Sequence, residues 1–142
     1  MAARIRIILD TNWYISATIN KKSRRILYKL LSNPSLIILF TDEILREYED
    51  VISRDKFRKI INPKQVARFM NLVMSQLENI LLLSNLTGSR DLKDNFLLSL
   101  SLDGNADYLI TGDLDLLVLK QTGLTKIVSL NDFLKIISHT AQ

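Results

Sequence analysis

Residues 4–14 read RIRIILDTNWY, and this stretch decides the fold. Its apolar residues (Ile5, Ile7, Ile8 and Leu9) predict a buried strand that ends before Asp10. The small polar residues that follow favour a turn or a helix cap over a longer strand. In an open parallel sheet, ligands bind at the carboxyl ends of the strands. The sequence therefore predicts a carboxylate at the ligand-binding edge of a sheet.

A second stretch has the same pattern. Residues 106–110 predict another strand, which runs into Thr111, Gly112 and Asp113. If the two strands are parallel neighbours, Asp10 and Asp113 reach the same edge. Each carboxylate also has a purely structural interpretation, because Asp10 can cap a turn and Asp113 can cap the short helix that follows.

The composition indicates one globular domain over residues 1–142. Hydrophobic residues make up 47% of the chain, and there are no cysteines, which excludes a disulfide scaffold and a thiolate metal site. The apolar run at the N-terminus is too short for a signal peptide, and no 18-residue apolar segment is present. We therefore expect a soluble cytoplasmic protein that does not enter a membrane.

Charge is distributed unevenly along the chain. The net charge is +4, made up of +1 over residues 1–20, +6 over 21–68 and −3 over 69–142. The basic half suggests a polyanionic partner, although a solvated basic face explains the same pattern. The acidic half is where cation ligands are expected.

Apolar strands and amphipathic helices alternate over the rest of the chain. This alternation predicts an α/β fold with a parallel sheet that is covered on both faces. The predicted elements are a helix over 23–32, a strand over 36–40, helices over 42–53 and 63–78, an edge strand over 80–83, a helix over 91–104, a short helix after Asp113, a strand over 126–128 and a final helix capped by Ser129 and Asp132.

Two further carboxylates are candidates for the sheet edge. At about 100° per residue, Glu47 lies at the border of the apolar stripe of helix 42–53, next to Val51, so its side chain can reach a cleft. Asp94 stands in the first turn of the apolar helix 91–104, where Asp91 and Asp94 also resemble a capping box. Solvated or capping roles remain open for both residues.

Four carboxylates at one edge would repel one another unless they took up protons or bound a cation. Oxygen ligands without Cys or a nearby His favour a hard ion, Mg²⁺ or Mn²⁺. Such ions act on phosphate esters, where one ion activates water and a second stabilises the leaving oxygen.

These motifs together resemble the PIN-domain family, and most closely its branch of toxin components of toxin–antitoxin systems. The resemblance rests on residues 9–12 (LDTN), Thr41 with Glu47, residues 91–95 (DLKDN) and residues 106–117 (ADYLITGDLDLL). It covers nearly the whole chain. Trp13 and Tyr14 depart from the small aliphatic residues common in the family, and they serve either packing or base stacking.

The resemblance implies a three-layer α/β/α domain and a metal-dependent single-strand ribonuclease. Asp10, Glu47, Asp94 and Asp113 would be the catalytic, metal-binding carboxylates, with Asp115 as an auxiliary ligand. Asn12 and Thr111 would support the carboxylates or contact phosphate. The resemblance also implies a homodimer and a cognate antitoxin protein as partners.

The resulting hypothesis is hydrolysis of RNA phosphodiester bonds with one or two Mg²⁺ or Mn²⁺ ions, by in-line attack of water that leaves a 5′-phosphate. Basic residues are expected to hold the RNA backbone, namely Lys21, Lys22, Arg24, Arg25, Arg54, Lys56, Arg58 and Lys59. One alternative is a PIN-like module that binds RNA or protein without cutting. A phosphotransfer domain with an aspartate nucleophile fits less well, because Asn12 stands where a D-x-D signature needs its second aspartate. No P-loop pattern is present, which disfavours nucleotide hydrolysis of that kind.

Overall fold

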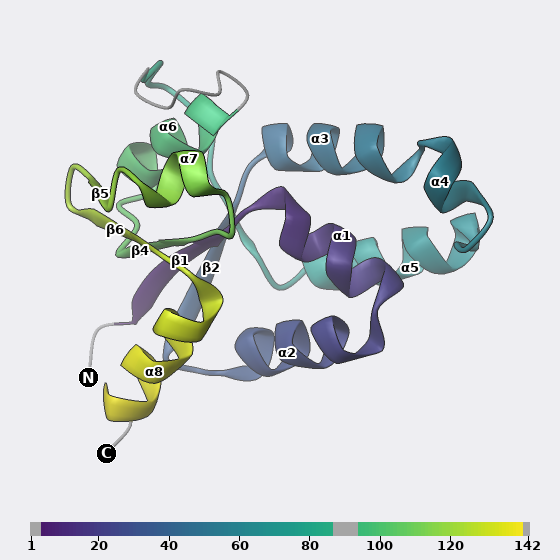
Figure 1. Cartoon of the computed structure of the whole chain (residues 1–142), viewed down its shortest axis with the longest axis horizontal. Coiled ribbons are helices and arrows are strands. Elements are labelled where there is room, and N and C mark those ends of the chain that lie inside the picture. Colours follow the sequence, from purple (N-terminus) through teal and green to yellow (C-terminus); the bar gives the residue numbers. More distant parts are fainter. Residues whose placement is uncertain (1–3, 87–93, 141–142) are drawn as a thin grey trace.

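The computed structural model describes residues 4–86 and 94–140 (Figure 1). In chain order its elements are β1 (Ile5–Leu9), α1 (Thr11–Ile19), α2 (Lys21–Ser32), β2 (Leu36–Phe40), α3 (Asp42–Ile52), α4 (Asp55–Arg58), α5 (Pro63–Met74), β3 (Glu78–Asn79), α6 (Asn95–Asp103), β4 (Tyr108–Ile110), α7 (Leu114–Leu117), β5 (Gln121–Thr122), β6 (Thr125–Val128) and α8 (Leu130–Thr140).

The strands of this part of the chain form one sheet in the order β3-β2-β1-β4-β6-β5. Every neighbouring pair is parallel except β5 and β6, which are antiparallel. β1 lies between β2 and β4, with Leu9 opposite Ile110. The predicted parallel pairing of the two strands that precede Asp10 and Asp113 is therefore confirmed.

Helices cover both faces of the sheet, as predicted. On one face, Leu27 of α2 and Leu130 of α8 lie around Leu9 of β1. Leu39 of β2 is paired with Ile8, so it points to the opposite face from Leu9. There it meets the end of α6, where a Cβ at Gly104 would lie only 2.7 Å from Leu39 Cδ1. None of the described helices is long and apolar enough to cross a membrane.

The α1 helix was missed, because only a turn was expected at residues 10–12. Thr11, Tyr14, Ile15 and Ala17 are all buried, so the helix is enclosed on more than one side. Such a helix has apolar residues around most of its circumference and lacks the one-sided pattern that reveals an amphipathic helix. In Figure 1, α1 leaves the centre of the molecule, where β1 ends, and runs to the start of α2.

Several predicted boundaries also shift. The strand expected over 80–83 is wrong, since β3 covers Glu78 and Asn79 and the last bond to β2 runs from the Ile80 amide to the Phe40 carbonyl at 2.8 Å. Its apolar pattern misled because Leu81 and Leu83 are exposed. The α2 helix begins earlier than predicted because Asn20 Oδ1 accepts hydrogen bonds from the amides of the first turn. β5, with two residues, was too short to predict.

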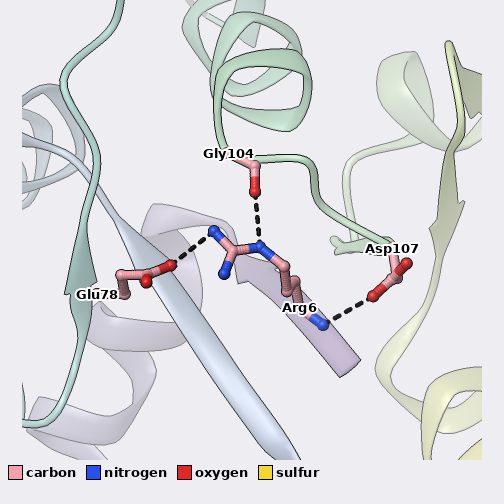
Figure 2. A network of polar contacts seen from close by, with 4 residues as sticks. All are labelled: Arg6, Glu78, Gly104 and Asp107. Atoms are coloured by element: carbon pink, nitrogen blue, oxygen red, sulfur yellow. Dashed lines mark hydrogen bonds and ion pairs between the residues drawn. The ribbon is translucent and has the colours of Figure 1, made fainter. Parts of the chain in front are cut away.

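Arg6 connects β1 to β3, to the end of α6 and to the residue that precedes β4, at the end of β1 that lies away from Asp10 (Figure 2). Its Nε donates to the Gly104 carbonyl at 2.8 Å, and its guanidinium forms an ion pair with Glu78 of β3 at 2.6 Å. Its backbone amide donates to the Asp107 carboxylate at 2.9 Å, and the Asp107 amide returns a bond to the Arg6 carbonyl at 2.7 Å. This network fixes how the strands are aligned, and so where their opposite ends meet.

Candidate active site at the carboxyl edge of the sheet

Asp10 directly follows the buried β1 and is only 5% exposed. Its backbone amide donates to the Ile110 carbonyl at 3.2 Å, which extends the pairing of β1 with β4. Its carbonyl accepts from the Trp13 amide at 3.1 Å, which begins α1. The side chain makes no capping hydrogen bond to α1. The carboxylate is instead directed to the end of the neighbouring strand.

Thr111 holds that carboxylate in place. Its hydroxyl donates to Asp10 Oδ2 at 2.5 Å and accepts from the Asp113 amide at 3.0 Å. Thr111 is fully buried, and its own amide donates to the Val128 carbonyl at 3.0 Å. The hydroxyl therefore links the segments that carry Asp10 and Asp113, both placed at this edge by the parallel strands β1 and β4.

Asp113 has a structural role as well as its place at the edge. Its Oδ1 accepts from the Asp115 amide at 2.8 Å and so caps α7. The capping interpretation of Asp113 is confirmed, and a carboxylate has a second oxygen that can serve a ligand.

Burial raises the pKa of Asp10 from 3.8 to about 6. The Thr111 hydroxyl and the nearby amides of Trp13, Asn12 and Gly112 stabilise the charged form and offset part of this effect. Desolvation is nevertheless the largest cause, so a negative charge at Asp10 is costly in the protein alone. Perturbed carboxylates of this kind are common at functional sites.

Tyr14 packs inside the protein, and the half-buried Trp13 packs against its core. Tyr14 is fully buried, and its ring meets that of Phe40 edge-on with centroids 5.6 Å apart. Burial and the charge of Asp10 both raise the pKa of its hydroxyl. Trp13 lies between Leu9 and residues of α2. These contacts favour the packing interpretation over base stacking. Sequence reasoning missed that Tyr14 lies within the electrostatic reach of Asp10, because it did not predict the α1 helix that carries Tyr14.

The remaining predicted ligands lie on separate elements. Glu47 is half-buried on α3, next to the buried Tyr48, and Asp94 is half-buried immediately before α6. Asp115 is half-buried in the first turn of α7, and Asn12 is exposed at the start of α1. Within residues 4–86 and 94–140, no three Asp, Glu or His side chains are grouped closely enough to hold one metal ion. Asp91, the other half of the expected capping box, lies outside the described residues.

The chemistry at Asp10 fits a hard cation. The donors at this edge are all oxygen atoms, which suit Mg²⁺ and Mn²⁺. Asp10 Oδ1 is buried and accepts no side-chain hydrogen bond from the described part of the chain. A nearby cation would compensate for the burial that now raises the pKa of this group.

The basic residues predicted to bind RNA differ in how they are held. Arg24 is half-buried, and its guanidinium donates to the carbonyls of Ala17 and Thr18, both at 2.9 Å. Arg54 and Arg58 pair with Asp50 and Asp55 at 3.3 and 3.4 Å on the surface. The others are exposed, namely Lys21, Lys22, Arg25, Lys56 and Lys59.

Comparison with known proteins bears on the family and the fold of the chain. A family model described as PIN domain matches residues 6–115. The fold is similar to that of a chain in the crystal structure of VapBC2 from Rickettsia felis bound to a DNA fragment from their promoter. The TM-score is 0.57 at 20% identity, over 87% of this chain and 97% of that chain. The comparison with curated proteins gives no significant match.

Proposed function

Because the chain belongs to the PIN domain family, we propose that it is a metal-dependent ribonuclease that hydrolyses phosphodiester bonds of RNA. PIN domains are generally nucleases. The observation that carries the proposal is the buried carboxylate of Asp10, which Thr111 orients at the carboxyl end of β1. A charged group this costly to bury is expected where it serves a ligand.

Each site residue has a role in this proposal. Asp10 and Asp113 hold Mg²⁺ or Mn²⁺, with Glu47, Asp94 and Asp115 completing the carboxylate set. Thr111 keeps Asp10 in its ligand-binding orientation, and the exposed Asn12 contacts phosphate at the start of α1. One or two bound ions would make water a better nucleophile and stabilise charge on the phosphate. The exposed lysines and arginines of residues 21–25 and 54–59 hold the RNA backbone.

We further propose that the chain is the toxin of a toxin–antitoxin pair. The similar fold in the VapBC2 structure supports an antitoxin protein as the partner. Self-association into a homodimer belongs to the same proposal. Expression of the wild-type chain alone should then stop bacterial growth, whereas expression of Asp10→Asn should not.

A second candidate function is binding of RNA or protein without catalysis. It is favoured by the absence of a three-carboxylate cluster within residues 4–86 and 94–140. The two candidates differ in whether a phosphodiester bond is broken.

The deciding experiment measures cleavage of a 5′-labelled RNA pool in Mg²⁺, in Mn²⁺ and in EDTA. Asp10→Asn keeps the size of the side chain and can still accept a hydrogen bond from Thr111, but it loses the charge. The matched control is Asp132→Asn, which removes an exposed carboxylate from the first turn of α8.

We expect cleavage in either metal, none in EDTA, a loss of at least a hundredfold in Asp10→Asn and no change in Asp132→Asn. Metal-dependent cleavage that Asp10→Asn retains would reject the site assignment. RNA binding with no cleavage in any metal would reject the nuclease and favour the binding module.

A further inference from the structure

A polar cavity of about 460 Å³ lies away from the sheet edge, where three helices meet. Its walls are the end of α1, the middle of α2, residues 60–62 and the first two turns of α5, which lie near one another in Figure 1. We call it the α1–α2–α5 cavity. The lining residues that matter for its chemistry are Thr18, Arg24, Tyr28, Asn62, Gln65 and Phe69. Its volume is within the usual range for small-ligand sites.

Aromatic rings form one part of the wall. The rings of Tyr28 and Phe69 meet edge-on, with centroids 6.2 Å apart and planes 61° from parallel. Tyr28 is 37% exposed, so part of its side chain is open to a ligand. The guanidinium carbon of Arg24 lies 6.0 Å from the centroid of Phe69. Flat side chains with exposed surface are what nucleic acid bases stack on.

The polar part of the wall is held before any ligand arrives. Arg24 donates to two carbonyls in the last turn of α1, those of Ala17 and Thr18, and so fixes α2 against α1. Asn62 Oδ1 accepts from the amides of Lys64 and Gln65 at 3.0 and 3.3 Å, which fixes the start of α5. The walls are thus tied to the backbone, which reduces the entropy lost when a ligand binds.

Two sequence segments of one charge sign surround the cavity. Residues 11–41 include α1 and α2, and residues 56–77 include α5. Together these segments contain ten of the 19 Lys and Arg residues of the chain and none of its 15 Asp and Glu residues. Among the ten, Lys21, Lys22, Lys64 and Arg68 are exposed on α2 and α5. A ligand at this place therefore meets positive charge without a competing carboxylate from either segment.

We propose that the α1–α2–α5 cavity binds one nucleotide of single-stranded RNA, with its base against Tyr28 and its phosphates near Lys21, Lys22 and Lys64. The exposed Gln65 supplies hydrogen-bonding groups for the base, whereas the Thr18 hydroxyl is already bonded to the Tyr14 carbonyl and the Tyr48 hydroxyl. α1 begins after Asp10 and ends at the cavity, a length of about 13 Å for its nine residues. A single RNA strand is long enough to span that distance. This inference rests on the proposed ribonuclease function and names a second contact for its substrate.

The test measures binding in EDTA, so that cleavage plays no part. A fluorescein-labelled ten-nucleotide single-stranded RNA is titrated with the wild type, Tyr28→Phe and Tyr28→Leu, using fluorescence anisotropy. Phe keeps the aromatic ring, whereas Leu keeps an apolar side chain without it. We expect Tyr28→Phe to bind like the wild type and Tyr28→Leu to bind about tenfold more weakly, as loss of one stacked base predicts. Thermal melting checks that both variants are folded.

A second measurement locates the base. In ¹H–¹⁵N spectra, adenosine 5′-monophosphate should shift the amides of Thr18, Ile19 and Gln65, and ribose 5-phosphate should shift them far less. Equal shifts from both compounds would overturn the proposal, because the base would then contribute nothing. Equal RNA affinity of Tyr28→Leu and wild type would overturn it as well. A third contrary result is that poly-glutamate displaces the RNA equally well from the wild type and from Tyr28→Leu. That result would indicate a site for an acidic peptide.

These outcomes are separate from the test of catalysis. Base-dependent binding at the cavity without metal-dependent cleavage would support nucleotide binding at the cavity and reject the ribonuclease function. Cleavage that is lost in Asp10→Asn, together with unchanged RNA binding in Tyr28→Leu, would support the ribonuclease function and reject nucleotide binding at the cavity.

Discussion

At the scale of single residues, Asp10 carries the main energetic cost of the site. Its pKa is about 6 in the folded protein and 3.8 as the reference value, so the folded state binds this proton more tightly than the unfolded state. The carboxyl then favours folding most at low pH, and this contribution is lost as the pH rises from about 4 to 6. The difference between the two pKa values corresponds to roughly 3 kcal/mol in the free energy of unfolding, which is lost over that pH range.

Asp10→Asn should therefore raise the free energy of unfolding at pH 7 by roughly 1–3 kcal/mol. Urea denaturation of the wild type and the variant in EDTA, between pH 4 and 8, measures the difference. The gain should be largest above pH 6 and disappear near pH 4. A gain that does not depend on pH would contradict the assignment of the shift to Asp10.

Thr111 is the second residue at which a small change has a large expected effect. Thr111→Val keeps the shape of the side chain but removes the hydroxyl that serves both Asp10 and the Asp113 amide. Leaving these buried groups without a partner should cost about 1–3 kcal/mol of stability and reduce RNA cleavage. Thr111→Ser keeps the hydroxyl and should retain cleavage. Thermal melting and the cleavage assay test both, and equal loss in the two variants would indicate that the methyl group matters instead.

At the scale of elements, the Arg6 network holds β1 against β3 and β4. Arg6→Lys keeps the positive charge but cannot reproduce the planar fork that contacts the Gly104 carbonyl and Glu78. We expect it to lower the free energy of unfolding by about 1 kcal/mol. Glu78→Gln should cost less, because Glu78 is 44% exposed and surface ion pairs contribute little. Urea denaturation compares them, and a larger loss in Glu78→Gln would show that the ion pair dominates.

The sequence predicted those elements whose pattern is simple. The strands that lead to Asp10 and Thr111 are short, apolar and bounded by turn residues, and their parallel pairing follows from alternation with helices. α1 was missed because it is enclosed on more than one side, and residues 80–83 misled because exposed leucines imitate a strand. Thr111 was named through family resemblance, since its hydrogen bond to Asp10 joins residues 101 positions apart. No local pattern contains that information.

At the scale of the whole molecule, positive charge is concentrated in residues 21–68, with a net charge of +6, whereas residues 69–142 carry −3. RNA binding should weaken as salt rises, with a slope that reports the number of phosphates contacted, at about 0.7 per contact for single strands. The double variant Lys21→Ala/Lys22→Ala should lower the slope by about 1.4. Lys126→Ala/Lys135→Ala removes the same charge from exposed positions on β6 and α8 and should leave the slope nearly unchanged. Anisotropy titrations between about 50 and 300 mM KCl, a range in which salt strongly changes the RNA affinity, compare the two double variants. Equal changes in the two variants would show that net charge, rather than its location, controls binding.

The ends of the sheet have a consequence for how the protein meets other molecules. The outermost strands in the described part of the chain, β3 and β5, have two residues each. Such short edge strands offer few free backbone groups, so another polypeptide forms few hydrogen bonds by adding a strand there. Fibril-like stacking through these edge strands is disfavoured for the same reason. Protein partners, including a second copy of this chain, should therefore bind through side chains of the helices. The sheet should not continue into a neighbouring subunit.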